Sequence, residues 1–422
     1  MNLNYRRKRR ERHHAASQDD DTATKPHLEH SLVARGDAQL VTTRAELDEV
    51  LAHMRAKGVF AYDTEFIGEE SYWPKICLVQ LATTERVALV DAQALPDLAP
   101  IFELVADPAL LTIVHAGTQD LEPVRRILGR EPANTLDVQV AAAFAEMPWP
   151  AGLEKLVDRF AGHRLSKGHT FTNWDARPLT PSQLRYAADD VRYLPLVWER
   201  LREDLERRGT LAWAMRECEM NVKIPARFDE ESQLRRTMKS WPMKPAQVPT
   251  LRLVLRLRDT IARGEDLPHR VVMPDETVAD IVRQRPMSPQ QLLAVRGLPK
   301  RFAQKYAEEL AQAVDEGGRM PPEKLAHGKI TEETGDDRAA IDALHAILSA
   351  RAIAMGLAPS MVFTRGDLSR WWLSRGTKSP EPLFDEGDWR GDAMGAWVES
   401  FLKGESTVSI SWKDGRPALG GS

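Results

Sequence analysis

Two acidic residues on alternate positions, Asp63 and Glu65, are the first feature of this chain whose type and spacing could do chemistry. They follow the apolar run 58–62, which is typical of a buried strand. Side chains two apart on a strand point the same way, so we expect both carboxylates to project together from the strand end. Two like charges held together are costly unless a cation neutralises them. The pair could alternatively be solvated acids at a surface strand end.

A tyrosine and an acid, Tyr186 and Asp190, form the second such feature. They lie four residues apart in a helical stretch and therefore share one helix face. Together with the acidic pair they offer only oxygen ligands, which suit Mg2+ or Mn2+ better than zinc. The two cysteines, Cys77 and Cys218, are too few for a disulfide framework or a zinc cluster. The sequence therefore predicts a site for hard divalent cations, although Tyr186 alone could also be a core residue.

Two further polar segments lie between these features, at 115–120 and at Asp137. Asp120 could supply another carboxylate, or it could cap a helix. His115 is of a type that packs or orients a neighbour more often than it binds a metal. Asp137 could be a buried hydrogen-bond acceptor or could orient a ligand, and we leave it outside the predicted metal set.

The composition is that of a globular protein with several domains. The chain has 422 residues, of which 42% are hydrophobic and 28% charged, and this length allows about two to four domains. Its net charge of −4 is nearly neutral, so nucleic-acid binding would need local basic patches. No apolar run approaches the ~18 residues of a membrane helix, and the N-terminus lacks the apolar segment of a signal peptide. We therefore expect a cytoplasmic protein with no membrane partner.

Helix and strand signals predict an α/β domain followed by helical bundles. The expected strands lie at 59–63, 76–82, 86–91 and 111–115. The short connection at 83–85 implies a hairpin, and the whole pattern favours a mixed sheet flanked by helices. After about residue 249 only helical signals remain, and a tryptophan-containing segment near the end is interpreted as a diverged copy of the first bundle.

The expected boundaries are a disordered basic tail at 1–36, the α/β domain at 38–220, a linker at 221–248, the first bundle at 249–315, a linker at 316–334, the second helical domain at 335–405 and a flexible tail at 406–422.

The ordered motifs resemble the DEDD exonucleases, in the subgroup with a tyrosine in the third motif, and specifically the ribonuclease D family. The segments that carry the resemblance are FAYDTEF at 60–66, YWPKICLVQL at 72–81, HAGTQDL at 115–121, LDVQ at 136–139, NWDARPL at 173–179 and YAADDV at 186–191. The bundle at 249–315 is similar to the HRDC module. The resemblance implies an α/β ribonuclease H-like 3′-5′ exonuclease domain followed by all-α HRDC-type bundles.

The resemblance also implies a set of metal-binding and catalytic side chains, namely Asp63, Glu65, Asp120 and Asp190, with Tyr186 as a catalytic helper. The family spacing selects Asp190 rather than Asp189, which we expect to face elsewhere. The implied cofactors are two Mg2+ (or Mn2+) ions at the scissile phosphate, with Tyr186 orienting the attacking water. The expected substrate-binding residues are Thr64, Phe66, His115 and Lys167.

The activity implied by the resemblance is a 3′-5′ exoribonuclease that releases nucleoside 5′-monophosphates, in tRNA 3′ maturation or RNA turnover. The expected partner is RNA, in particular structured RNA such as tRNA precursors, and no stable protein partner can be inferred. Two alternatives remain: a non-catalytic nucleic-acid-binding protein, and the same chemistry acting on DNA. A non-catalytic binding protein would have no reason to keep all four acids and the tyrosine. Metal-dependent chemistry at the phosphate does not distinguish ribose from deoxyribose, so the sequence leaves DNA open as a substrate.

Basic residues outside the acidic set could contact phosphate or could be ordinary surface charges. In the first bundle these are Arg252, Arg256, Arg258, Lys300, Arg301 and Lys305. In the α/β domain, Lys167 and Arg177 could contact phosphate or form surface salt bridges. Each phosphate contact would add to the salt dependence of binding.

Overall fold

The structure, a computed structural model, describes residues 27–68, 70–165, 173–221, 227–323, 333–377, 380–385, 387–413 and 416–420. Most of the expected basic tail, residues 1–26, lies outside them. The expectation of disorder was wrong for residues 27–36, because Val33 and Ala34 are buried and the Arg192 guanidinium donates a hydrogen bond to the Ala34 carbonyl. Within the described residues, no helix is both long and apolar enough to cross a membrane.

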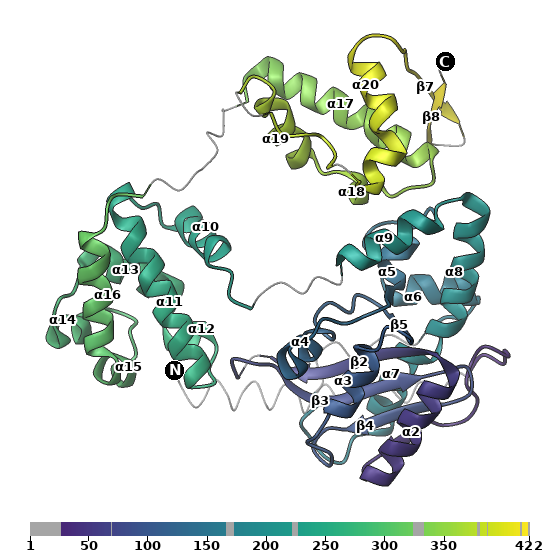
Figure 1. Ribbon diagram of the computed structural model, residues 1–422, viewed down its shortest axis with the longest axis horizontal. Helices are drawn as coiled ribbons and strands as arrows, with labels where there is room; N and C mark the ends of the chain where they lie inside the picture. Colours follow the sequence, from purple (N-terminus) through teal and green to yellow (C-terminus); the bar gives the residue numbers. More distant parts are fainter. Residues whose placement is uncertain are drawn as a thin grey trace.

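A six-stranded mixed sheet forms the centre of the N-terminal domain (Figure 1). Its strands are β1 (Gln39–Val41), β2 (Val59–Ile67), β3 (Lys75–Ala82), β4 (Val87–Asp91), β5 (Leu111–Val114) and β6 (Thr135–Asp137). They lie in the order β1-β4-β3-β2-β5-β6. β3 and β4 form the antiparallel hairpin that their short connection predicts. β2 pairs antiparallel with β3 and parallel with β5, which confirms the mixed sheet.

Helices cover both faces of this sheet. On one face, apolar residues of β2 and its neighbours pack against α2 (Arg44–Lys57), α3 (Ala99–Val105) and α4 (Glu122–Leu128). On the other face the helices are α5 (Val138–Ala142), α6 (Leu153–Leu156), the π-helical turn η1 (Val157–Ala161), α7 (Pro181–Arg192), α8 (Leu194–Arg208) and α9 (Leu211–Asn221). α2 begins with the capping box formed by Thr43 and Glu46, in which each side chain satisfies a backbone N–H of the first turn.

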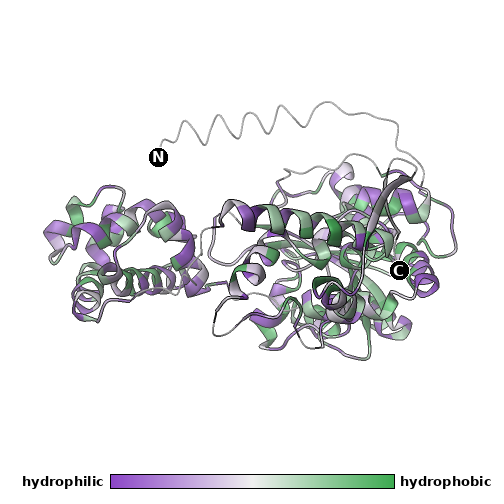
Figure 2. Cartoon of the chain, turned by 90° about the horizontal axis from the view of Figure 1, so that it is seen from above, coloured by the Kyte–Doolittle hydropathy of each residue, from purple (hydrophilic) through white to green (hydrophobic). Residues whose placement is uncertain are grey.

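A separate helical bundle follows, seen at the left of Figure 1 and as a distinct body in Figure 2. Its elements are α10 (Glu230–Ser240), the 3-10 turn η2 (Pro245–Gln247), α11 (Val248–Gly264), α12 (His269–Val272), α13 (Asp275–Gln284), α14 (Pro289–Ala294), α15 (Lys300–Lys305) and α16 (Ala307–Arg319). α11 packs along α16, and apolar residues from both helices, including Leu251 and Leu310, are fully buried. The bundle therefore has a core of its own.

The last described part of the chain is a second helical segment. It comprises α17 (Gly335–Ala354), α18 (Pro359–Val362), α19 (Arg365–Ser374), the π-helical turn η3 (Gly391–Gly395) and α20 (Ala396–Leu402). The expectation of a flexible tail after residue 405 was wrong, because β7 (Ser409–Lys413) and β8 (Arg416–Gly420) pair there as an antiparallel hairpin. Backbone pairing between the two strands satisfies N–H and C=O groups that a tail would leave to water.

This second segment shares one apolar core with the α/β domain. The Trp389 ring lies edge-on to Phe144, 4.6 Å between centroids, and the Trp389 indole donates to the Glu217 carboxylate at 2.6 Å. Backbone bonds join Ala358 N–H to the Ala143 carbonyl at 2.8 Å and Glu146 N–H to the Gly356 carbonyl at 3.0 Å. The α/β domain and the C-terminal helices therefore form a single packed unit.

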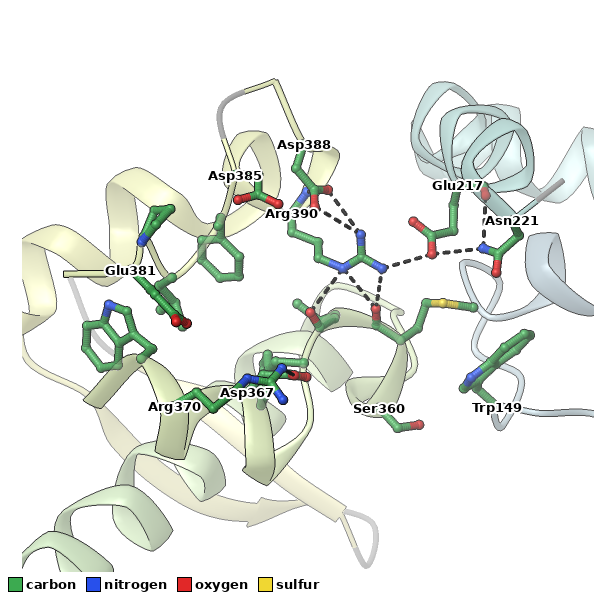
Figure 3. A pocket seen from close by; sticks show the side chains of 17 residues that line it. Trp149, Glu217, Asn221, Ser360, Asp367, Arg370, Glu381, Asp385, Asp388 and Arg390 are labelled. Carbon is green, nitrogen blue, oxygen red and sulfur yellow. Dashed lines mark hydrogen bonds and ion pairs between the residues drawn. The ribbon is translucent and has the colours of Figure 1, made fainter. Parts of the chain in front are cut away.

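A pocket of about 510 Å³ lies along this junction. Figure 3 shows Arg390 at its centre, with hydrogen bonds to Glu217 on α9, to Asp388 and to two backbone carbonyls. Trp149 lines the pocket from the side of the α/β domain. None of the acids that the sequence predicts to bind metal lines this pocket, so the pocket is separate from the predicted metal site.

Candidate active site

The central strand β2 carries the first two acids. Asp63 pairs with Gln80 and Glu65 with Leu78 of β3, and β2 continues to Ile67. The prediction that the two acids sit at the end of a strand was therefore wrong, because pairing with β3 extends the strand past them. The register shifts between Glu65 and Phe66, an irregularity that locally re-aims side chains.

Helix α7 brings the third acid and the tyrosine to the same place. Thr180 caps the helix, its side chain accepting from Gln183 N–H, and α7 then packs across β2, β3 and β4. One carboxylate oxygen each from Asp63, Glu65 and Asp190 lies within 4.8 Å of the other two. Tyr186, one turn before Asp190, makes a side-chain hydrogen bond to the Asp190 carboxylate.

Asp120 lies beside this group, in the turn between β5 and α4. Its carboxylate accepts a hydrogen bond from the Thr64 hydroxyl, and its backbone carbonyl accepts one from the Tyr62 hydroxyl at 2.9 Å. Asp120 is buried, and its charge raises the pKa of both Asp63 and Glu65. Asp120 is therefore close enough to act on the cluster electrostatically, although it is not one of the three acids that converge most tightly.

Burial raises the pKa of every one of these acids. The pKa of Glu65 rises to about 8 through burial and then through the charges of Asp190 and Asp120. The pKa of Asp190 also rises to about 8, through burial and the neighbouring Asp189, against a lowering by the Tyr186 hydrogen bond. Burial raises the pKa of Asp120 to about 6 and that of Asp63 well above its usual range. Burial and mutual repulsion thus disfavour the charged forms until a cation compensates them.

No lysine, arginine or histidine among the described residues forms an ion pair with Asp63, Glu65, Asp120 or Asp190. The adjacent Asp189 has a different environment, with charged nitrogens of Arg192 at 3.7 Å and Arg185 at 3.8 Å, and His27 at 3.6 Å. Asp189 therefore faces away from the cluster, as expected. A compact set of acids whose donors are all oxygens suits a hard divalent cation.

The structure gives the other expected residues different surroundings. The Thr64 hydroxyl is occupied by Asp120, and Phe66 is partly exposed beyond the register shift. His115 Nε2 lies 3.0 Å from the Ala151 carbonyl, which is a structural contact. The expected phosphate-binding residue Lys167 lies outside the described residues.

Asp137 and Arg177 have structural partners. The Asp137 carboxylate accepts backbone N–H groups of Ala116 at 3.0 Å and Gln139 at 2.9 Å, so it holds the turn that leads to Asp120. The Arg177 guanidinium makes two 2.7 Å hydrogen bonds to the Asp91 carboxylate. Of the two alternatives that the sequence left open, a phosphate contact or a salt bridge, the structure shows the salt bridge.

Two residues that support the site had no role in the sequence-based prediction. The Tyr62 hydroxyl fixes the Asp120 turn, and the Trp174 ring lies 6.1 Å from the Tyr186 ring, centroid to centroid. Both residues belong to motifs that carry the family resemblance, so the signal was present. Their contacts join segments far apart in the sequence, which residue spacing alone does not reveal.

Most basic residues expected to meet phosphates in the first bundle are paired within the protein. Arg252 and Arg256 both bind Glu230, and Lys305 binds Glu265. Arg258 is 1% exposed and pairs with Asp275, so it is neither a phosphate contact nor an ordinary surface charge, the two alternatives that the sequence left open. Lys300 and Arg301 are exposed, and the Arg301 guanidinium lies 4.4 Å from the Phe302 ring centroid.

Comparison with known proteins agrees with this arrangement. The family described as 3′-5′ exonuclease matches residues 38–206, which include all four acids and Tyr186. The HRDC domain family matches residues 250–314, which lie in helices α11 to α16 of the first helical bundle.

Curated relatives extend the similarity over most of the chain. Ribonuclease D of Nitrobacter hamburgensis is 33% identical over 334 residues, covering 78% of this chain and 87% of the relative. Ribonuclease D of Gluconacetobacter diazotrophicus is 32% identical over 388 residues, covering 91% and 95%. The crystal structure of Escherichia coli RNase D matches with a TM-score of 0.73 at 26% identity, over 87% of this chain and 99% of that chain. The chain therefore belongs to the ribonuclease D family and is a 3′-5′ exoribonuclease with a divalent-metal-dependent DEDD exonuclease fold.

Proposed function

We propose that Asp63, Glu65, Asp120 and Asp190 together hold two divalent cations, Mg2+ or Mn2+. The observation that carries this proposal is the convergence of buried carboxylates with raised pKa values and, among the described residues, no basic ion-pair partner. Cations bound there would polarise the scissile phosphodiester and lower the pKa of an attacking water. The protein's own part is to fix the ligand oxygens in a buried site, so that little reorganisation is needed during the reaction.

Tyr186 would orient the attacking water beside Asp190. Its pKa is raised well above the ordinary value by burial and by the charges of Asp190, Glu65 and Asp63, so the hydroxyl stays protonated at neutral pH. A protonated phenol is a hydrogen-bond donor and acceptor rather than a proton-abstracting base. Thr64 acts one step further away, because its hydroxyl holds the Asp120 carboxylate.

The substrate would be structured RNA, such as a tRNA precursor, trimmed from its 3′ end with release of nucleoside 5′-monophosphates. The similar Escherichia coli protein is described as an exoribonuclease involved in structured RNA processing. The HRDC bundle offers Lys300 and Arg301 as exposed cations on one helix start, and each could neutralise a phosphate.

The C-terminal helices would form a second HRDC-like domain, at 335–405. Helices α11, α12 and α13 of the first bundle and helices α17, α18 and α19 follow the same pattern, with a long helix, a helix of 4 residues and a helix of 10 residues. In both, the short helix begins at the fifth position after the long helix ends, as Gly264 is followed by His269 and Ala354 by Pro359. This supports the interpretation of a diverged copy that has come to pack on the exonuclease domain.

A strand-degradation assay tests the function. Single strands of RNA and DNA with a 5′ label, and a tRNA precursor with a 3′ extension, are incubated with the full chain and EDTA, Mg2+ or Mn2+. We expect a ladder that shortens from the 3′ end of RNA, only with a cation, and mononucleotide products. Faster degradation of DNA than of RNA would contradict the substrate, and degradation in EDTA would contradict the metal site.

A further inference from the structure

The loop between β2 and β3 reaches from the exonuclease domain to the HRDC bundle, on the side of α12 in Figure 1. Its residue Tyr72 is only 1% exposed, although it lies on a loop. The ring packs in the apolar core of the bundle, which also contains Leu234 of α10 and Leu255 of α11. A loop residue buried in the core of a different domain indicates a specific docking contact, because surface loops ordinarily leave their side chains in water.

The Tyr72 hydroxyl is held by a buried carboxylate of the bundle. It donates to Asp259 Oδ1 at 2.7 Å, and the same oxygen lies 2.8 Å from His269 Nε2. Arg263 Nη2 donates to the other oxygen of Asp259 at 3.1 Å. Asp259 is therefore satisfied by two donors of the bundle and one donor of the exonuclease domain. Withdrawal of Tyr72 would leave both a cavity and a carboxylate lacking one of its partners.

A second anchor fixes the backbone of the same loop. Asp266 Oδ1 accepts the N–H groups of Tyr72 at 3.1 Å and Trp73 at 3.4 Å. Arg227, which precedes α10, lies over both aromatic rings, at 5.3 Å and 5.6 Å from their centroids. Polar, apolar and cation–π contacts therefore converge on two adjacent residues.

The docked loop connects two strands that lie next to the candidate active site. The strand before the loop, β2, carries Asp63 and Glu65. On its other side, Lys75 at the start of β3 forms an ion pair with Asp175, next to the Trp174 ring that lies beside Tyr186. The position of the bundle is thus tied through one short loop to the strand and the segment that frame the acidic cluster.

We propose that Tyr72 is a positioning residue that docks the HRDC bundle beside the active site, so that an RNA bound to the bundle presents its 3′ end to the acidic cluster. This inference rests on the proposed function. Domains joined by linkers move relative to one another unless an interface fixes them. A docked bundle holds a bound RNA at a higher effective concentration near the catalytic acids than a tethered one does. Substrates long enough to touch both parts should benefit, whereas a short single strand should not.

The test compares three variants of the full chain with a matched control. Tyr72→Ala removes the ring and the hydroxyl, Tyr72→Phe removes only the hydroxyl, and Asp266→Gly removes the backbone anchor at a residue whose φ of +48° glycine tolerates. The control is Tyr306→Phe, which also removes a tyrosine hydroxyl from a carboxylate, Glu265 at 2.6 Å, but within the bundle itself. Small-angle scattering measures compactness, and steady-state kinetics are measured on a tRNA precursor and on a short single strand.

We expect Tyr72→Ala and Asp266→Gly to raise the radius of gyration and to raise KM for the tRNA precursor by about 10-fold, with kcat within about twofold. Tyr72→Phe should show a smaller rise in KM, and Tyr306→Phe none. On the short strand all variants should match the wild type. An unchanged KM, or an equal loss of kcat on both substrates, would overturn the inference alone. No hydrolysis by the wild-type chain would overturn the proposed function and this inference together.

Discussion

Two adjacent aspartates on helix α7 have opposite electrostatic surroundings. Asp190 joins Asp63 and Glu65 in a group with no basic ion-pair partner among the described residues, and its pKa rises to about 8. Asp189 faces Arg185 and Arg192, and its pKa, raised by burial but lowered by both arginines, reaches about 6. The difference comes from the neighbours, because both carboxylates are largely buried and stand on the same helix.

A third acid shows the other extreme. Burial alone would raise the pKa of Asp91, but the paired hydrogen bonds from Arg177 bring it below its ordinary value. Arginine therefore compensates the buried carboxylates of Asp91 and Asp189. At the acidic cluster no described basic side chain forms an ion pair with the acids, and under the proposed function a cation compensates them.

Replacing Asp63 or Asp190, which have no basic ion-pair partner among the described residues, should reduce turnover the most. Asp63→Asn or Asp190→Asn keeps the size of the side chain but removes a carboxylate that we propose binds the cations, so we expect turnover to fall by at least ~10³-fold while the fold is kept. Single-turnover degradation of labelled RNA measures this loss, and circular dichroism checks the fold. Near-normal degradation by either folded variant would remove that residue from the active site.

The tyrosine beside Asp190 should have the next largest effect. In Tyr186→Phe the ring still packs near Trp174, but the hydroxyl that we propose orients the attacking water is lost, so the rate of hydrolysis should fall by ~10²–10⁴-fold with cation binding retained. Single-turnover kinetics at saturating Mg2+ provide the measurement. An unchanged rate would make Tyr186 a packing residue.

The stability of the metal-free protein should depend on pH through the same group. Folded-state pKa values of about 8 for Glu65 and Asp190 mean that the folded protein binds more protons than the unfolded chain from about pH 4, the ordinary carboxyl pKa, up to about pH 8. The free energy of unfolding contributed by these acids should therefore fall as pH rises through this window.

Thermal unfolding in EDTA at several pH values tests this dependence, with Asp190→Asn as the comparison. The wild-type Tm should decline more steeply towards pH 8 than that of the variant, and Mg2+ should raise the wild-type Tm at pH 8 much more than at pH 5. If Tm depends on pH in the same way in both proteins, the carboxylates of the cluster do not destabilise the fold when they are charged.

Replacing Asp189, the aspartate that faces two arginines, should have the smallest effect on turnover. Asp189→Asn removes a charge that faces Arg185 and Arg192 rather than the cluster, so we expect RNA degradation within about threefold of wild type. Its cost should appear in stability instead, at about 1–3 kcal/mol, because the buried Arg192 loses an ion-pair partner. Urea unfolding measures that cost. A large loss of turnover without destabilisation would place Asp189 in the active site.

The sequence predicted those residues of the candidate site that lie close together along the chain. The alternate acids on a strand and the tyrosine four residues before Asp190 are local signals, and the structure brings them together. The capping box of α2 and the hairpin of β3 and β4 were predictable for the same reason. The end of β2 was misjudged because pairing with β3, rather than the residues of β2 themselves, extends it.

Contacts between distant segments could not be read from the sequence. The hydrogen bond from Thr64 to Asp120, the burial of Tyr72 in the HRDC bundle and the bond from Trp389 to Glu217 each join residues at least 56 positions apart. Several arginines of the bundle looked available for phosphate because their acidic partners lie 17 to 71 residues away in sequence. Composition indicates that charges are present, but only the tertiary fold decides which of them are paired.

Direct titration of cations tests whether the acidic cluster is the metal site. Isothermal titration calorimetry of Mn2+ into the metal-free chain is compared with the same titration of Asp190→Asn and Asp189→Asn, two changes of identical chemistry at adjacent positions. We expect wild type and Asp189→Asn to bind Mn2+ alike, and Asp190→Asn to lose at least ~10-fold in affinity. Equal binding by all three proteins, or a loss confined to Asp189→Asn, would contradict the assignment of the acidic cluster as the metal site.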